Sequence, residues 1–145
     1  MVPPYGGLTL IADTSAWVRA DHPLVRDEWS AALAEMQIAT TPIVAGELLR
    51  STRSAAKFDE WQERLDALHI VDLTRAITAA ALGALRDLAH QAPMRHRLPF
   101  QDALIAAAAQ DRGWGVLHYD HDFDRLAEVL DFASCWIAPS DSLEQ

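Results

Sequence analysis

The chain has 145 residues and a net charge of −9, and half of its residues are hydrophobic. This composition is typical of a globular protein, so we expect one domain over residues 1–145. No apolar run reaches the roughly 18 to 20 residues that cross a bilayer, and residues 1–7 lack a secretory pattern. Cys135 is the single cysteine, so no internal disulfide forms, and we expect a small buried thiol in a cytoplasmic protein.

The acidic charge limits the functions that fit this chain. A protein that grips nucleic acid by neutralising phosphates is expected to be basic. This chain either acts on something else or gathers its acids in a metal-binding pocket while local basic residues contact phosphate. Candidate phosphate contacts are Arg50, Arg53 and Lys57 in one group and Arg95 and Arg97 in another. A solvated surface or a partner contact is the alternative interpretation of both groups.

In the first half of the chain, one predicted strand precedes several helices. Leu8–Ala12 is a short apolar run typical of a buried strand. Trp29, Leu33 and Met36 share a helical face. Thr41 before Pro42 predicts a capped helix start, and this helix runs to Arg50. An apolar stripe predicts a further amphipathic helix, made of Phe58, Trp61, Leu65 and Leu68.

The second half alternates strands and helices more clearly. A short strand is expected at 70–73, a helix at 77–88, and an alanine-rich helix from Pro99 to Arg112, stopped by Gly113. A strand at 116–119, a helix at 123–130 and a last strand at 134–137 follow. This alternation predicts an α/β fold with a mostly parallel sheet covered by helices.

Two acidic residues follow predicted strands. Asp13 comes directly after the strand at 8–12, and Asp120 follows the strand at 116–119. In open parallel sheets, functional residues gather beyond the carboxyl ends of the strands. Asp13 also stands where a helix N-cap is expected. Asp122 is a candidate cap for the helix expected from Phe123, which leaves Asp120 for chemistry.

A third acid, Glu47, lies on a predicted helix. It would share a face with Ile43 and Val44, and a charge on an apolar face needs a partner or a metal. A salt bridge to Arg50 or Arg53 is the alternative explanation.

A fourth acid, Asp102, lies in the first turn of the helix at 99–112. The helix dipole alone favours a negative charge there. However, residues 103–109 are all small or apolar, so we expect this helix to be buried on most sides. An acid at the head of a buried helix is a stronger functional candidate than one on a surface helix.

Carboxylates that share one pocket repel one another and raise one another's pKa values. A divalent cation removes this cost, and hard oxygen ligands favour Mg²⁺ or Mn²⁺ over zinc. The histidines show no zinc spacing, and the sequence has neither a glycine-rich phosphate loop nor a GxSxG nucleophile. The candidate site residues are Asp13, Glu47, Asp102, Asp120 and Asp122.

The acids lie in four segments: Asp-Thr-Ser after a strand, Gly-Glu-Leu-Leu on a helix, Gln-Asp-Ala-Leu-Ile-Ala-Ala at a helix start, and Tyr-Asp-His-Asp-Phe after a strand. In this order and spacing they resemble PIN-domain nucleases, most of all the VapC toxins of bacterial toxin–antitoxin pairs. The resemblance covers about residues 8–138. It implies a PIN-like domain with a central, mostly parallel sheet of four to five strands flanked by helices.

The resemblance also implies a function. Asp13, Glu47, Asp102 and Asp120 would form the catalytic, metal-binding quartet, with Asp122 as a further ligand. The implied activity is an endoribonuclease that cleaves RNA by a water activated by Mg²⁺ or Mn²⁺. Family members are typically dimers silenced by a cognate antitoxin, so the implied partners are RNA, an antitoxin and a second copy of the chain.

One position departs from the family pattern. Where the family often carries Thr or Ser, two residues before the fourth acid, this chain has His118. Thr14 or Ser15 is the implied polar neighbour of the metal. The apolar stripe at 58–68 fits an antitoxin groove, a dimer face or the monomer core.

Two alternatives keep the fold but change the function. A housekeeping RNA-processing nuclease would use the same acids without an antitoxin. A non-catalytic binding module would need no acids at all, and the complete quartet argues against it.

Overall fold

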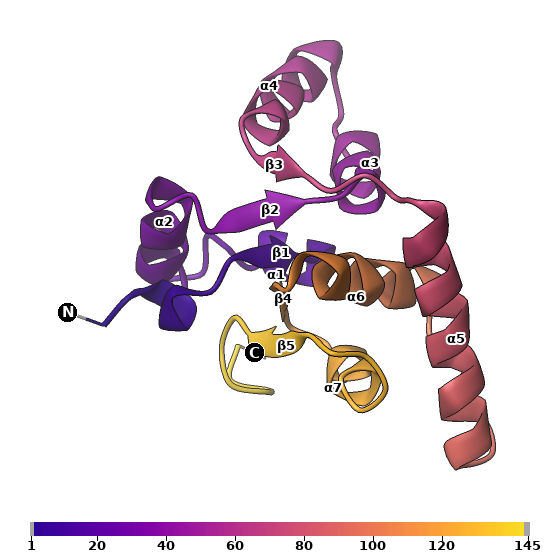
Figure 1. The fold of residues 1–145 in the computed structure, drawn as a ribbon. Coiled ribbons are helices and arrows are strands. Elements are labelled where there is room, and N and C mark those ends of the chain that lie inside the picture. Colours follow the sequence, from indigo (N-terminus) through magenta and orange to yellow (C-terminus); the bar gives the residue numbers. More distant parts are fainter. Residues whose placement is uncertain (1, 144–145) are drawn as a thin grey trace.

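The computed structural model describes residues 2–143, so both ends of the predicted domain, residues 1 and 145, lie outside this part of the chain. Its strands form one wholly parallel sheet in the order β3-β2-β1-β4-β5 (Figure 1). They are β1 (Leu10–Ala12), β2 (Ile38–Thr40), β3 (His69–Ile70), β4 (Gly115–His118) and β5 (Ala133–Trp136). This sheet confirms the predicted α/β class and its parallel strands.

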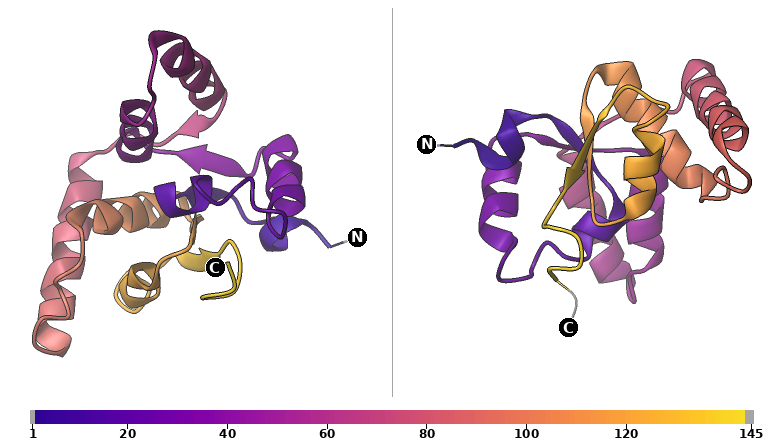
Figure 2. Two further views of the ribbon diagram at one scale, coloured as in Figure 1. Left: turned by 180° about the vertical axis from the view of Figure 1, so that it is seen from behind. Right: turned by 90° about the horizontal axis from the view of Figure 1, so that it is seen from below.

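Helices connect the strands and flank the sheet. They are η1 (Pro4–Gly7), α1 (Thr14–Trp17), α2 (Arg26–Ala34), α3 (Pro42–Arg50), α4 (Ala55–Asp66), α5 (Arg75–Gln91), α6 (Phe100–Arg112) and α7 (His121–Leu126). Figures 1 and 2 show α3 and α4 beyond the β2–β3 side of the sheet and α7 beside β5. The long helix α5 packs against α6. Within residues 2–143, no helix is long and apolar enough to cross a membrane.

Local sequence sets the helix ends. Thr41 Oγ1 accepts a hydrogen bond from the Val44 backbone N–H, and Pro42 occupies the first turn, so α3 begins where the sequence predicted. Gly113 ends α6 in the left-handed conformation, with φ 70°. These two signals place Glu47 on α3 and Asp102 in the first turn of α6.

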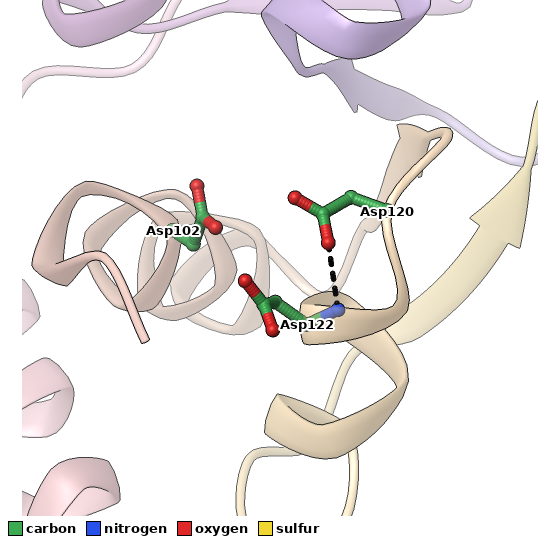
Figure 3. A group of neighbouring side chains, drawn as sticks. All are labelled: Asp102, Asp120 and Asp122. Carbon is green, nitrogen blue, oxygen red and sulfur yellow. Dashed lines mark hydrogen bonds between the residues drawn. The ribbon is translucent and has the colours of Figure 1, made fainter. Parts of the chain in front are cut away.

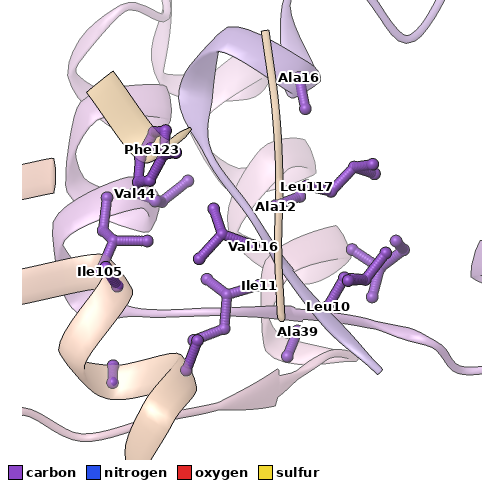
Figure 4. Packing of buried hydrophobic residues seen from close by; sticks show 14 of the residues in the cluster. Leu10, Ile11, Ala12, Ala16, Ala39, Val44, Ile105, Val116, Leu117 and Phe123 are labelled. Atoms are coloured by element: carbon purple, nitrogen blue, oxygen red, sulfur yellow. The ribbon is translucent and has the colours of Figure 1, made fainter. Parts of the chain in front are cut away.

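One part of the core lies between the central strands and α6. Ile11 from β1, Val116 from β4 and Ile105 from α6 are buried together (Figure 4). Gly115 lets β4 approach its neighbours closely, because a Cβ there would lie 2.6 Å from the Ala133 carbonyl oxygen. Parallel strands buried on both faces have continuous apolar runs, which is why β1 and β4 were visible in the sequence.

Several predicted details are wrong. Met36 lies beyond α2 with φ 56° and is 81% exposed, so it does not share a buried helical face with Trp29. The predicted stripe lies on α4 except for Leu68, which follows the end of the helix at Asp66. The expected buried thiol of Cys135 is only partly buried, since it lies on the edge strand β5.

The strand order fixes where a site can form. β1 lies between β2 and β4, so the connections from the sheet centre run in opposite directions on its two sides. Clefts in parallel sheets open at such a switch point, beyond the carboxyl ends of the strands. Asp13 follows β1, and Asp120 follows β4 by two residues. The fold therefore brings these two acids to the same edge.

Candidate metal centre

Three carboxylates converge at this edge of the sheet (Figure 3). Asp102, Asp120 and Asp122 each offer one oxygen, and these oxygens lie within 4.8 Å of one another. Asp102 comes from the first turn of α6, while Asp120 and Asp122 come from the start of α7. Several hard oxygen donors this close together suit a divalent cation such as Mg²⁺ or Mn²⁺.

The start of α7 differs from the prediction. Asp120, not Asp122, is the N-cap, and its Oδ1 accepts the Asp122 backbone N–H at 2.9 Å. The helix therefore begins at His121 rather than at Phe123. The Asp122 carboxylate does not cap the helix and lies close to that of Asp102 (Figure 3).

Asp13 caps α1, lies outside the group of three carboxylates, and is near enough for its charge to act on Asp102. It is 8% exposed, and its Oδ2 accepts both the backbone N–H and the Oγ–H of Ser15, at 3.0 and 2.6 Å. The same Ser15 Oγ accepts the Tyr119 backbone N–H at 2.9 Å. Ser15 thus joins the end of β1 to the end of β4 and holds Asp13 in place.

Glu47 is held by a hydroxyl rather than by an arginine. Thr14 Oγ1 donates to Glu47 Oε2 at 2.9 Å. Within residues 2–143, Glu47 forms no salt bridge with Arg50 or Arg53, so the ion-pair explanation from sequence is wrong. Thr14 and Ser15 are both polar neighbours of the acids.

The pKa of Asp102 responds to the charges of the other four candidate acids. Burial, followed by the charges of Asp13, Asp120, Asp122 and Glu47, raises the pKa of Asp102 to about 8. Burial also raises the pKa of Asp13, with a contribution from Glu47, and that of Asp122, with a contribution from Asp120. This mutual repulsion is the cost that a divalent cation removes, so the residues fit such an ion.

His118 lies behind the acids rather than among them. It is fully buried, its Nδ1 accepts the Asp120 backbone N–H at 3.2 Å, and its Nε2 lies 2.7 Å from Ser134 Oγ. Ser134 Oγ donates to Asp124 Oδ1 at 2.7 Å, and Trp136 Nε1 donates to Asp124 Oδ2 at 3.0 Å. Ser134 therefore accepts from Nε2–H, and because Nδ1 is an acceptor it carries no proton, so His118 is neutral. Burial lowers the pKa of His118 to about 4.

Sequence reasoning missed most of this chain of hydrogen bonds. Ser134 and Trp136 belong to β5, which pairs with β4 in parallel register, placing Trp136 beside His118. No local signal marks such a long-range pairing. The only sign of these contacts in the sequence was His118, which stands where the family often carries Thr or Ser.

The family model of the PIN domain matches residues 10–129, a range that contains all five acids. The chain therefore belongs to the PIN-domain family. Its relatives include two proteins of Mycobacterium tuberculosis. Ribonuclease VapC18 is 36% identical over 94% of this chain and 100% of its own length. Ribonuclease VapC51 is 32% identical over 94% of this chain and 98% of its own length.

Solved structures share the fold. DNA-bound VapBC from Salmonella typhimurium matches with a TM-score of 0.71 at 14% identity and covers 90% of this chain and 99% of its own. VapBC-5 from Mycobacterium tuberculosis, described as a member of the VapBC family of toxin–antitoxin systems, matches with a TM-score of 0.60 at 19% identity, covering 88% and 97%. At such identities the likeness concerns the fold alone.

Proposed function

We propose that this chain is a metal-dependent endoribonuclease and the toxin of a toxin–antitoxin pair. The convergence of Asp102, Asp120 and Asp122 at the switch point of a PIN-domain sheet, with the charges of Asp13 and Glu47 nearby, carries this proposal. Relatives named ribonuclease VapC support the activity, and similar folds in toxin–antitoxin complexes support an antitoxin partner. We also propose that it acts as a homodimer, as the family resemblance implies, and in the cytoplasm, as expected from the sequence.

The proposed site holds Mg²⁺ or Mn²⁺ through Asp102, Asp120 and Asp122, with Asp13 and Glu47 completing the catalytic group. When bound, the ion activates a water for attack on phosphorus and neutralises charge on the phosphate. Asp13 is kept in position by Ser15 and Glu47 by Thr14. The acids are thus preorganised before RNA arrives, so little rearrangement opposes the reaction.

The RNA backbone needs positive charge near these acids. Arg50 and Arg53 make no salt bridge within residues 2–143, whereas Lys57 and Arg95 each pair with a glutamate. We therefore assign phosphate contacts first to Arg50, the last residue of α3, the helix that carries Glu47, and to Arg53 in the turn that follows it. Arg95 is the weaker candidate, because its guanidinium group already forms a salt bridge with Glu128.

Induced expression in bacteria, followed by mapping of RNA ends, tests the proposal. We expect wild-type protein to stop growth and create new RNA ends, and Asp102→Asn to do neither while remaining folded. Asp111→Asn is the matched control, because Asp111 is an exposed acid on the same helix, and it should behave like wild type.

Other outcomes of this experiment favour the alternatives. Harmless overexpression of a protein that cuts RNA in vitro would favour a housekeeping nuclease. Calorimetry showing no Mg²⁺ or Mn²⁺ binding would favour a non-catalytic binding module.

A further inference from the structure

The turn at 118–121 carries Asp120 and joins β4 to α7, and the chain returns to this turn after β5. The Ile137 backbone N–H donates to the His118 carbonyl at 2.8 Å, so the segment that follows β5 starts in contact with the turn. We call residues 136–143 the C-terminal strap. It begins with the last residue of β5 and ends with the last residue that the structure describes.

Two hydrogen bonds attach the C-terminal strap to the neighbours of Asp120. The Leu143 backbone N–H donates to Tyr119 Oη at 3.0 Å, and this bond is buried. Ser140 Oγ lies 2.9 Å from His121 Nε2, within hydrogen-bonding distance. Tyr119 precedes Asp120 and His121 follows it, so the strap contacts the turn on both sides of that carboxylate.

Trp136 makes the most contacts of the strap with this turn. Its indole ring meets three other rings edge to face, with centroid distances of 5.0 Å to His118, 5.6 Å to Tyr119 and 4.8 Å to His121. Ring pairs in this arrangement attract one another. The indole Nε1–H donates to Asp124 Oδ2 at 3.0 Å, which also ties the ring to α7.

The Asp120 side chain is the exception in this turn. Among the described residues it makes no hydrogen bond or ring contact with the C-terminal strap, whereas the other three side chains of the turn do. One of its oxygens lies instead within 4.8 Å of oxygens of Asp102 and Asp122 (Figure 3). The turn is thus fixed before an ion arrives, and binding to a preorganised site costs less entropy.

We propose that the C-terminal strap positions Asp120 for the divalent cation and that Trp136 is its main positioning residue. The inference rests on the proposed function and adds a support that acts through Tyr119 and His121 rather than by touching the ion. The strap lies outside residues 10–129, the range that the PIN-domain family model matches, so the family match does not account for it.

Calorimetric titration of the purified protein with Mn²⁺ measures this support. We expect Trp136→Ala to bind Mn²⁺ about tenfold more weakly than the wild type, as for other groups that orient metal ligands. Trp136→Phe keeps a ring beside the turn and should bind more tightly than Trp136→Ala. Trp114→Ala is the matched control and should bind like the wild type. Trp114 is also half-buried and meets His69 edge to face at 5.2 Å, but it lies just before β4, at the opposite edge of the sheet.

Ser140→Ala keeps the test decisive if Trp136→Ala does not fold. Ser140 is exposed, and this substitution removes only its hydrogen bond to His121, so we expect a folded protein that binds Mn²⁺ more weakly than the wild type. Ser142→Ala is its control and should leave the affinity unchanged. Ser142 is an exposed residue of the same strap, and its hydroxyl makes no hydrogen bond within residues 2–143.

An NMR signal of the wild type reports on the C-terminal strap directly. The Trp136 Nε1–H donates to Asp124 on α7, the helix that Asp120 caps. Mg²⁺ should therefore shift the Trp136 indole N–H signal, which is identified by its absence in Trp136→Phe. The indole N–H signal of Trp114 should stay unchanged.

Wild-type affinity for Mn²⁺ in every folded variant of Trp136 and Ser140 would overturn the proposal. An equal loss of affinity in Trp114→Ala, or a Trp136 signal that Mg²⁺ leaves unchanged, would overturn it too. Weaker Mn²⁺ binding by Trp136→Ala, with no RNA cleavage by the wild type, would support the strap and contradict the proposed nuclease. Cleavage by the wild type, with full Mn²⁺ affinity in Trp136→Ala, would support the nuclease and contradict the strap. A wild type that binds neither ion would contradict both.

Discussion

His118 stands where the family pattern favours a hydroxyl, and the side chain takes a supporting part instead. It accepts the backbone N–H of Asp120, and Ser134 fixes its ring from the neighbouring strand. Groups that orient metal ligands commonly affect affinity as strongly as some ligands do. The His118–Ser134 pair therefore holds the backbone at Asp120 in place.

Ser134→Ala tests this support. It leaves Nε2 of His118 without its partner, so the turn that carries Asp120 loses its anchor. We expect the affinity for Mn²⁺ to fall about tenfold, the lower end of the range for such supports. Calorimetric titration measures it, with Ser30→Ala, an exposed position on α2, as the control. Unchanged affinity in Ser134→Ala would contradict the positioning role.

Asp102 predicts a pH dependence of stability in the metal-free protein. Its pKa is about 8 in the folded protein, against 3.8 for an unperturbed aspartate, so the folded protein holds the extra proton between these values. Folding stability contributed by this group is therefore lost as the pH rises from about 4 to about 8. Asp102→Asn removes the loss, so the variant should gain stability over wild type as the pH rises.

Denaturant unfolding with a chelator at about pH 5 and about pH 8 measures this difference. Comparing variant with wild type cancels the titration of His118, which runs in the opposite sense below its ordinary pKa. Asp111→Asn should show no such trend. If Asp102→Asn stabilises the protein no more at the higher pH than at the lower pH, the pKa of Asp102 is not raised in the folded protein.

Within the helices and strands, replacing two glycines by alanine should change the free energy of unfolding in opposite directions. A Cβ at Gly115 would lie 2.6 Å from the Ala133 carbonyl oxygen, so Gly115→Ala forces β4 and β5 apart. We expect it to lower the free energy of unfolding by about 1–3 kcal/mol. Gly46→Ala, inside α3 with nothing within 4 Å of its Cβ, should raise it by about 0.5–1 kcal/mol. Thermal or urea unfolding measures both; equal effects would contradict the packing described.

The sequence predicted the elements whose signals are local. Thr41-Pro42 and Gly113 indicated helix ends, and apolar runs indicated β1 and β4. Both acids that follow these strands were placed correctly, because parallel strands present their carboxyl ends to one edge. Sheet order was not visible in the periodicity, and the family resemblance implied only a strand number.

The features that could not be predicted from the sequence depend on contacts between segments that are distant along the chain. The choice of Asp120 over Asp122 as helix cap follows from how the chain leaves β4. The Thr14–Glu47 bond joins residues 33 positions apart, and the partners of His118 lie on β5. No pattern within one element encodes such contacts.

For the whole molecule, the net charge of −9 and an RNA substrate are compatible because the acids are concentrated. Asp102, Asp120 and Asp122 meet at one edge within reach of the charges of Asp13 and Glu47, and a divalent cation bound there would reverse the local field. Without the ion, this edge repels phosphate. Cleavage of RNA by this protein is therefore expected to depend on a divalent metal ion.

Cleavage of a mixed RNA substrate by purified protein, with Mg²⁺ or Mn²⁺ titrated against a chelator, tests that claim most directly. We predict cleavage only with the ion, a loss of about 100-fold or more in Asp102→Asn, and full activity in Asp111→Asn. Cleavage that persists in the chelator, or that survives in folded Asp102→Asn, would contradict the account.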